Sequence, residues 1–247
     1  MQYDVVIVGA GMVGLSIAAY LAQHSSARIA VCDPALAQST NLPAGAQVAD
    51  FDLRVSALSA QSQSWLQSLG AWQHIERKQA YQRMHVWDAE GTAAVTFDCH
   101  DLHRSDLGHI VENRQTVAAL LQLMHCLPVT FFSQAVAHID NPVNVLTPVV
   151  LQDGSRLQAS LVIGADGALS RVRQWAGLAT REWDYQHHAI VATVRMEQSL
   201  QHTAWQRFRS QGPLALLPLA QDPHLASIVW STVPQQAEGL MTLRDGG

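Results

Sequence analysis

Two short apolar runs flank a helical pattern at the start of the chain. YDVVIVG at 3–9 and RIAVCD at 28–33 are nearly continuous apolar segments, which is typical of strands buried on both faces. Between them, residues 12–24 carry apolar side chains at helical spacing. A strand, turn, helix and strand within about 30 residues predict a βαβ unit.

The middle of the chain alternates between helical and strand periods. Helical spacing marks 56–72 and 116–126, and a further helix is predicted over 168–177 with Gly177 at its end. Alternating residues predict a hairpin over 84–98 that turns near Glu90–Gly91. Residues 143–167 predict two strands joined at Asp153–Gly154, a dipeptide that favours tight turns.

The final quarter of the chain predicts a run of short strands. These cover 188–196, 204–208, 213–219 and 226–233. The change of period along the chain predicts an α/β fold, in which a Rossmann-like domain with a parallel sheet is interleaved with an antiparallel-sheet domain. We expect the first domain over 1–78 and 104–180 and the second over 79–103 and 181–247.

Composition narrows the function classes. The chain has 247 residues and a formal net charge of -5 without a basic block, which argues against a nucleic-acid partner. The three cysteines lie far apart, as expected for reduced thiols in a cytoplasmic protein. The 12 histidines are scattered without a matching ligand set, so we expect no metal site. No apolar run approaches the length of a membrane span, and no signal peptide is expected.

The first glycine-rich turn predicts a dinucleotide site. GAGMVG at 9–14 fits G-x-G-x-x-G and lies between a predicted buried strand and a helix. In this pattern Gly9 permits a sharp turn, Gly11 lets the backbone approach a pyrophosphate, and Gly14 lets the helix pack on the strand. Asp33, 19 residues after Gly14, ends the second strand and can accept hydrogen bonds from a ribose. These residues leave NAD, NADH and FAD open, and a turn made only for packing is the alternative.

A second turn, GADG at 164–167, follows another apolar strand. Asp166 would lie at the carboxyl edge of the sheet, where open α/β folds bind ligands, and Gly167 allows a turn beside a ligand. The second turn could then reach the same ligand as the first turn or a second nucleotide. The alternatives are that Asp166 only caps the following helix, and that Arg171 and Arg173 lie on a solvated helix face.

These motifs together resemble a known family. GAGMVG with Asp33, LRVSALS at 53–59 and GADGALSRVR at 164–173 resemble, in order and spacing, the class A flavoprotein aromatic hydroxylases. The branch that hydroxylates polyprenylphenols in ubiquinone biosynthesis is the most similar. The segments that carry this likeness are LGAWQHI (69–75), HVWD (85–88), LGHIVEN (107–113), LVIGADG (161–167), WDYQHHAIVATV (183–194), GPLALLPL (212–219) and SIVWS (227–231).

The resemblance implies a cofactor and its residues. The first domain would be an FAD-binding domain, in which Gly9, Gly11, Gly14 and Asp33 hold the ADP part of FAD. Arg54 would lie near the pyrophosphate and flavin, and Arg114 would contact FAD from the sheet edge. Asp166 and Gly167 would contact FAD and the reducing nucleotide, NADH or NADPH. The alternatives are a surface ion pair for Arg54 and a solvated charge at a helix start for Arg114.

The resemblance also implies a substrate and partners. The second domain would bind a polyprenylphenol, with Val191, Leu214, Leu216 and Trp230 lining an apolar pocket; ordinary sheet core is the alternative for each. The phenol oxygen donates electron density to the ring that is hydroxylated, so no catalytic side chain is expected. A ubiquinone-biosynthesis protein complex and a peripheral membrane contact are further implications.

The sequence departs from the family pattern in three respects, one of which is that Leu169 stands where a polar residue is common. Asp33 stands where the family more often has Glu, so the ribose contact would be looser. The second flavin motif of the family, G-D-A-A-H-x-x-x-P, is absent from these 247 residues. We therefore expect both domains to be incomplete in this chain, which alone would bind FAD weakly or not at all and would not turn over. A non-catalytic scaffold or assembly subunit is the second hypothesis, and an NAD-dependent dehydrogenase is the third.

Overall fold

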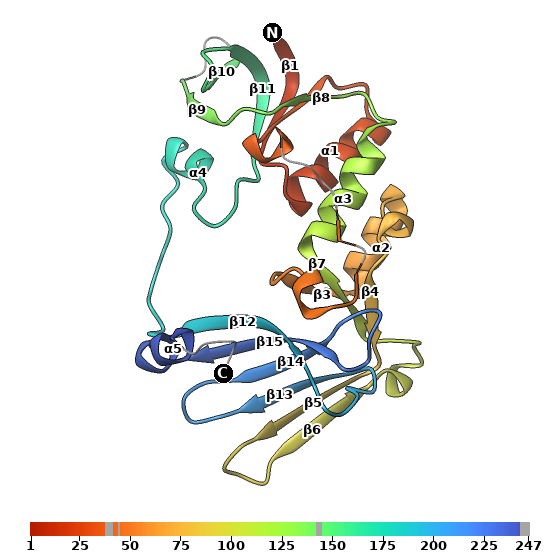
Figure 1. Ribbon diagram of the computed structural model, residues 1–247. Helices are drawn as coiled ribbons and strands as arrows, with labels where there is room; N and C mark the ends of the chain where they lie inside the picture. Colours follow the sequence, from red (N-terminus) through yellow and green to blue (C-terminus); the bar gives the residue numbers. More distant parts are fainter. Residues whose placement is uncertain (38–41, 44, 142–144, 243–247) are drawn as a thin grey trace. The chain divides into compact units, whose positions relative to one another are not determined.

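The computed structural model describes residues 1–37, 42–43, 45–141 and 145–242 (Figure 1). Contacts between residues divide the chain into two compact units. The first comprises Met1–Asn41, Leu66–Ile75 and Thr116–Arg181. The second comprises Leu42–Trp65, Glu76–Gln115 and Glu182–Gly247.

The first unit is built on a six-stranded sheet. Four neighbouring strands run parallel, and two antiparallel strands complete one side. The predicted βαβ unit is confirmed, as is the hairpin at Asp153–Gly154. In spatial order the strands are β8 (Val129–Phe132), β2 (Ile29–Cys32), β1 (Gln2–Val8), β11 (Arg156–Gly164), β10 (Thr147–Leu151) and β9 (Val136–Ile139).

The register of the parallel strands places the two motif turns together. Val8, the last residue of β1, pairs with Cys32 at the end of β2 and with Gly164 at the end of β11. Because carboxyl ends of parallel strands meet at one edge of a sheet, both glycine turns leave from this edge. The backbone N–H of Ala165 still donates to the carbonyl of Val8, at 2.8 Å, so the turns are joined directly.

Helices cover the sheet of the first unit. Helix α1 (Met12–His24) packs on β1 and β2, and the short α4 (Arg171–Trp175) packs on β11 and β9. Val6 and Val8 share one buried cluster with Val172 and Trp175 of α4. The alternate residues of β1 are buried too, which explains the continuous apolar run in the sequence.

The second unit holds a six-stranded sheet of its own. Its neighbours pair antiparallel, as predicted, except β13 and β5, which are parallel. No tight turn joins these two strands, since the chain passes through the first unit between them, so a hairpin does not dictate their direction. The order is β12 (His188–Arg195), β15 (Leu225–Thr232), β14 (Leu214–Pro218), β13 (Thr203–Phe208), β5 (Arg83–Asp88) and β6 (Ala94–Asp98).

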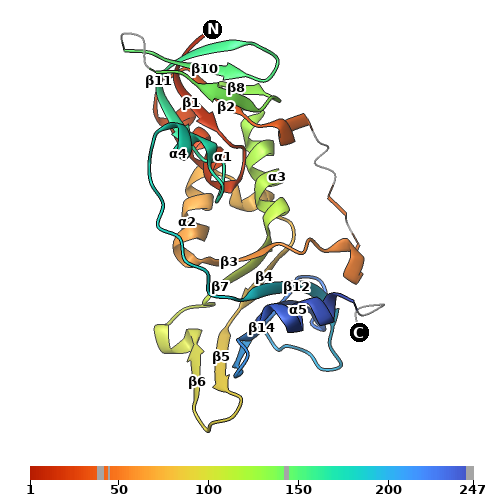
Figure 2. The same ribbon diagram turned by 90° about the vertical axis from the view of Figure 1, so that its left-hand side faces the viewer.

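A three-stranded antiparallel sheet completes the second unit. It consists of β3 (Val55–Ser59), β7 (Gly108–Glu112) and β4 (Lys78–Tyr81). Both views show β4 running on into β5, which links the two sheets (Figures 1 and 2). The core between them contains Phe51, Tyr81, Ile110, Ala204, Leu219 and Leu225. A short helix, α5 (Pro234–Met241), follows β15.

The structure corrects several predicted boundaries. The helix expected over 56–72 is α2 (Ala60–Leu69), because residues 55–59 pair with β7 as β3. This long-range pairing overrides the local helical spacing. In the division by contacts, 42–65 and 104–115 belong to the second unit, whereas we expected them in the first domain, and the bounds of the two functional domains stay a prediction. Helix α4 begins at Arg171 rather than 168, since Ser170 is its N-cap.

Other elements fall close to their predicted positions. Helix α3 (Asn113–Met124) and the strands after 186 are confirmed within a few residues. Strands β4, β7, β8 and β9 and helix α5 were not predicted. Among the described residues no helix is both long enough and apolar enough to cross a membrane.

Candidate functional site

The first and third glycines of the GAGMVG turn are required by packing. Gly9 has φ +108, a conformation that L side chains rarely adopt, and a Cβ there would overlap the carbonyl oxygen of Ala165. A Cβ on Gly14 would overlap the carbonyl oxygen of Gly9. These two glycines therefore let β1, α1 and the second turn approach one another.

Gly11 has a different role. A Cβ at this position would meet nothing within 4 Å, so the space above it is open. Gly11 is the N-cap of α1, and no side chain caps the helix. The first N–H groups of α1 thus point out without an intrahelical acceptor, at the positive end of the helix dipole. An anionic group fits this place, as at other glycine-rich helix starts.

Asp33 follows β2 and braces the same turn. Its Oδ2 accepts the backbone N–H of Ala10 at 2.7 Å, and its Oδ1 accepts the backbone N–H of Ala35 at 2.8 Å. Each carboxylate oxygen retains a lone pair for a further donor. The Asp33 side chain is therefore held in place and can still accept a ligand hydroxyl.

The second turn is closed by Asp166. Its Oδ1 accepts the Ser170 hydroxyl at 2.6 Å, and its Oδ2 accepts the backbone N–H of Arg171 at 2.7 Å and of Val172 at 3.2 Å. Burial raises the pKa of Asp166, but the hydrogen bonds from Ser170 and the two backbone groups outweigh burial and hold its pKa below the ordinary value. Gly167 has φ +85, which favours glycine. Asp166 thus caps the short helix, as the alternative expected, and also faces a pocket.

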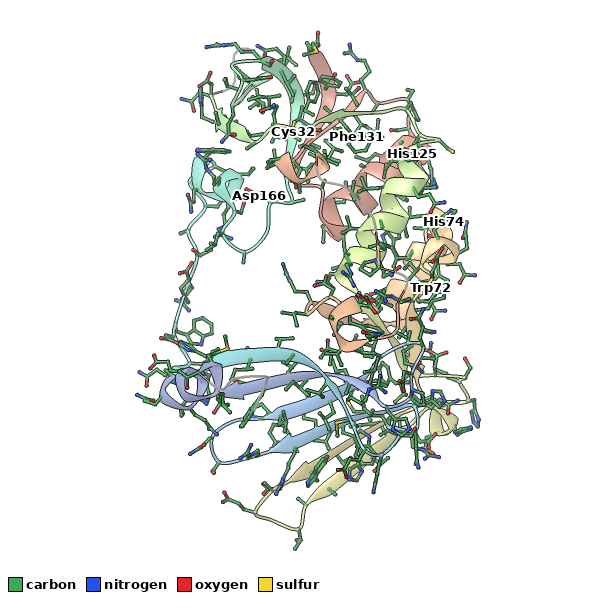
Figure 3. All side chains as sticks on the ribbon, viewed as in Figure 1. Cys32, Trp72, His74, His125, Phe131 and Asp166 are labelled. Carbon is green, nitrogen blue, oxygen red and sulfur yellow. The ribbon has the colours of Figure 1, made fainter. Side chains whose placement is uncertain are left out.

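That pocket joins the two turns within the first unit. It has a volume of about 390 Å³. Its lining includes Gly9, Gly11, Asp33, Asp166 and Gly167, five of the predicted residues, together with Cys32, Arg171 and Trp175. Gly14 is not part of the lining. The expected convergence of Gly11 and Asp166 on one edge of the sheet is observed, and Figure 3 labels Cys32 and Asp166 there.

Among the lining residues that the sequence analysis did not assign to the site, Arg171, Trp175 and Cys32 have side chains that bear on its chemistry. The guanidinium of Arg171 lies 4.9 Å from the centre of the Trp175 ring and donates to the carbonyl of Ala137 at 3.2 Å. Arg171 is therefore held at the pocket wall, although it was predicted only as a residue near the turn or on a solvated face. Burial raises the pKa of the Cys32 thiol to about 12, so it lines the pocket as a neutral group. The i, i+4 spacing of Arg171 and Trp175 was the available signal.

The two predicted arginines belong to the second unit. The Arg54 side chain is exposed, and its guanidinium has no hydrogen-bond or ion-pair partner in the part of the chain that the structure describes. Arg114 is anchored, because its Nε and Nη2 donate to Glu112 Oε2 at 2.9 and 2.7 Å. It is neither a freely solvated charge nor fully buried, with 29% of its side chain exposed.

The four residues predicted to line a substrate pocket do not share one face of the sheet. Trp230 pairs with Leu214 and with Ile190, and Leu216 lies on the same face two residues beyond Leu214. Val191, next to Ile190, points to the opposite face. Val191 and Ile190 both line a pocket of about 870 Å³ between α5 and β12, the edge strand of the sheet. One pocket therefore does not take all four side chains.

One group of side chains is close enough for a shared metal ion. Asp98, Cys99 and His100 have their ligand atoms within 4.8 Å of one another. Asp98 is already used, since it accepts the backbone N–H and the ring nitrogen of His100 and the Nε of Arg83. These contacts explain the cluster as the cap of a short 3₁₀ turn, Cys99–Leu102.

Comparison with known proteins adds to this geometry. A family model described as an FAD binding domain matches residues 2–242. "Ubiquinone biosynthesis monooxygenase COQ6, mitochondrial" of Xenopus tropicalis is 38% identical over 98% of this chain and 54% of its own length. "3-demethoxyubiquinol 3-hydroxylase" of Escherichia coli strain K12 is 36% identical over 97% of this chain and 60% of its own length.

A solved structure shows the same fold. The crystal structure of pqsL, a probable FAD-dependent monooxygenase from Pseudomonas aeruginosa, superposes with a TM-score of 0.75 at 18% identity, over 98% of this chain and 63% of that one. The chain thus spans between about half and two thirds of the length of each protein it matches.

Proposed function

The chain belongs to the family of FAD binding domains, and from that premise we propose that the full product of its gene is an FAD-dependent monooxygenase. Its substrate is a polyprenylphenol, whose aromatic ring is hydroxylated in ubiquinone biosynthesis. The assignment of FAD as the cofactor is supported by the convergence of five predicted residues on one pocket at the sheet edge. The substrate class follows from the names of the two curated relatives.

The first unit would hold the ADP part of FAD. The open space over Gly11 and the uncapped N–H groups of α1 suit the pyrophosphate. Asp33 accepts hydrogen bonds from the ribose, while its contacts to Ala10 and Ala35 hold the carboxylate in place. Gly9 and Gly14 act through packing, and Asp166 and Gly167 shape the wall through the cap of α4.

The second unit would contribute two cations. Arg54 offers its unpaired guanidinium to the pyrophosphate or the flavin, where a planar fork of donors suits phosphate oxygens. Arg114 adds its remaining donors, since Nε and Nη2 are occupied by Glu112. These assignments rest on the family pattern and on the exposed state of Arg54.

A bound reduced flavin supplies the oxygen-activating chemistry, and NADH or NADPH supplies the electrons. The protein binds and orients the phenol and excludes water. Because a phenol ring is electron-rich, no protein nucleophile is required. We assign the substrate to the pocket of about 870 Å³ between α5 and the edge strand β12, which Val191 lines and Trp230 does not.

The assignment of this pocket has a direct test. Val191→Trp fills the pocket beside α5 and is expected to raise KM for a polyprenylphenol by about tenfold. The matched variant Trp230→Leu changes a side chain outside the pocket lining and leaves KM unchanged. A rise in KM for Trp230→Leu alone would contradict the assignment of the substrate to this pocket.

A polyprenyl tail also requires an apolar environment. We therefore extend the proposal to a peripheral membrane contact and to association with other proteins that handle the same apolar intermediates. Co-sedimentation of the full gene product with phosphatidylglycerol vesicles tests the membrane contact, and protein left in the supernatant at all lipid concentrations contradicts it.

The overall function is tested with the full gene product. We expect a flavin absorbance spectrum, oxidation of NADH or NADPH that depends on the phenol, and a hydroxylated ring by mass spectrometry. Deletion of the gene should accumulate the unhydroxylated intermediate. A flavin-free protein that still restores ubiquinone synthesis would favour the scaffold, and NAD-dependent oxidation without flavin would favour the dehydrogenase.

A further inference from the structure

A buried carboxylate in the second unit collects donors from three residues. The Glu112 side chain at the end of β7 is 2% exposed. Its Oε2 accepts the backbone N–H of Asp52 at 2.7 Å, Nη2 of Arg77 at 3.0 Å and Nη2 of Arg114 at 2.7 Å. These donors come from sequence positions up to 60 residues away.

Arg77 connects this network to residues 45–50, which precede Arg54 in the sequence. Its side chain is 3% exposed, and it donates to the carbonyl oxygens of Gly45 and Asp50, both at 3.0 Å. Its guanidinium also lies 4.6 Å from the centre of the Phe51 ring. Arg114 donates to the carbonyl of Asp50 as well. Two cations and one anion thus hold the backbone of residues 45–52.

The backbone of Arg54 itself is fixed on both sides. Its N–H donates to Asp52 Oδ1 at 3.1 Å, and its carbonyl accepts the N–H of Asn113 at 2.9 Å. Its side chain, by contrast, is exposed and has no ionic or hydrogen-bonded partner among the described residues. A backbone held so firmly beneath an unpaired guanidinium is the arrangement of a group prepared for a ligand.

We propose that Glu112, supported by Arg77, is a positioning residue that holds residues 45–54 so that Arg54 presents its guanidinium to an anionic group of the cofactor. The proposal rests on the proposed function, in which that group belongs to FAD. Buried ion pairs give little net stability after desolvation, yet they fix geometry, which is the role assigned here. Glu112 acts through Arg54 and is not itself a ligand of the cofactor.

The test is a double-mutant cycle on the full gene product, with FAD affinity as the readout. Glu112→Gln keeps the shape of the side chain but removes the charge that three donors share. We expect it to raise the Kd for FAD by about tenfold in the presence of Arg54. In an Arg54→Ala background the same change should raise Kd by only about threefold or less, because only its hold on Arg114, the second proposed cofactor cation, remains.

A merely structural role gives a different pattern. If Glu112 only stabilised the fold, Glu112→Gln would weaken FAD binding equally in both backgrounds, and that result overturns the proposal. Arg28→Gln is the matched control, since it removes the exposed Arg28–Asp4 ion pair at the amino ends of β1 and β2, the sheet edge opposite the two glycine turns. It should leave Kd unchanged.

Hydrogen exchange separates this inference from the proposed function. In the protein without FAD, Glu112→Gln should speed exchange of the Asp52 and Asn113 amides, while amides of β14 and β15 keep their rates. Unchanged exchange at Asp52 and Asn113 overturns the anchoring whether or not FAD binds. Faster exchange in a protein that binds no FAD supports the anchoring and overturns the proposed function instead.

Discussion

Two regions of the chain offer positive charge to an anion by different means. The turn at 9–14 uses bare backbone, with an uncapped helix start and open space over Gly11. The segment at 45–54 uses a side chain, Arg54, whose backbone is held by a buried network around Glu112. In the first region the chemistry lies within six consecutive residues, whereas in the second it is assembled from distant parts of the sequence.

This difference decides what each region tolerates. In the turn, substitution of Gly9 or Gly14 is restricted because an added Cβ would overlap backbone atoms. In the segment, the geometry depends on charges that are costly to bury once a partner is removed. Stability should therefore respond to changes in both regions, but for different physical reasons.

The largest expected effect is in the buried network. Arg77→Met leaves the Glu112 carboxylate buried with less compensation and removes the donors to the Gly45 and Asp50 carbonyls. We expect the free energy of unfolding to fall by about 3–5 kcal/mol. Urea unfolding of the full gene product measures it. A loss similar to that of the exposed pair variant Arg195→Gln, about 0–1 kcal/mol, would contradict the role of the network.

A somewhat smaller effect is expected in the glycine turn. Gly9→Ala combines a strained positive φ with overlap on the Ala165 carbonyl, so we expect a loss of about 2–3 kcal/mol. Gly11→Ala, the matched control two residues on, meets open space and should cost about 0.5 kcal/mol as a poorer N-cap. An equal loss of unfolding free energy in the two variants would contradict the assignment of Gly9 to packing and of Gly11 to open space for a ligand.

The smallest effect concerns the cap of α4. Asp166→Asn keeps the size of the side chain but weakens the acceptors for Ser170, Arg171 and Val172, so we expect a loss of about 1 kcal/mol at neutral pH.

The pH dependence of that effect follows from the lowered pKa of Asp166. A carboxyl whose pKa is lower in the folded state contributes stability above its unfolded pKa, near 3.9, and loses it as the pH falls through the folded pKa. The difference between wild type and Asp166→Asn should thus be constant at neutral pH and shrink below about pH 4. A difference that grows toward low pH would contradict the assignment.

The sequence predicted the candidate site residues best where they lie in short local motifs. The turn at 9–14, Asp33 and the second turn were predicted with their positions because each follows an apolar strand, and parallel strands end at one edge. The packing roles of Gly9 and Gly14 were also predicted, and a Cβ at either position would overlap a backbone carbonyl oxygen.

Long-range packing set the limit of prediction. Arg77 carried no signal, since nothing in its neighbours indicates that Glu112, 35 residues later, will bury it. Strand β3 was taken for the start of a helix because its partner, β7, is distant in sequence. The side of the sheet to which Val191 points depends on how β12 pairs with β15. Periodicity alone does not tell which side of the sheet each alternate residue takes.

The pocket between the two turns is proposed to receive the pyrophosphate half of FAD over Gly11. Titration of the full gene product with FAD, followed by flavin fluorescence, tests it in wild type and in Gly11→Val, with unfolding measured in parallel. We expect at least about tenfold weaker binding in the variant while the free energy of unfolding changes by about 1 kcal/mol or less. Equal FAD affinity in the two proteins would contradict the account.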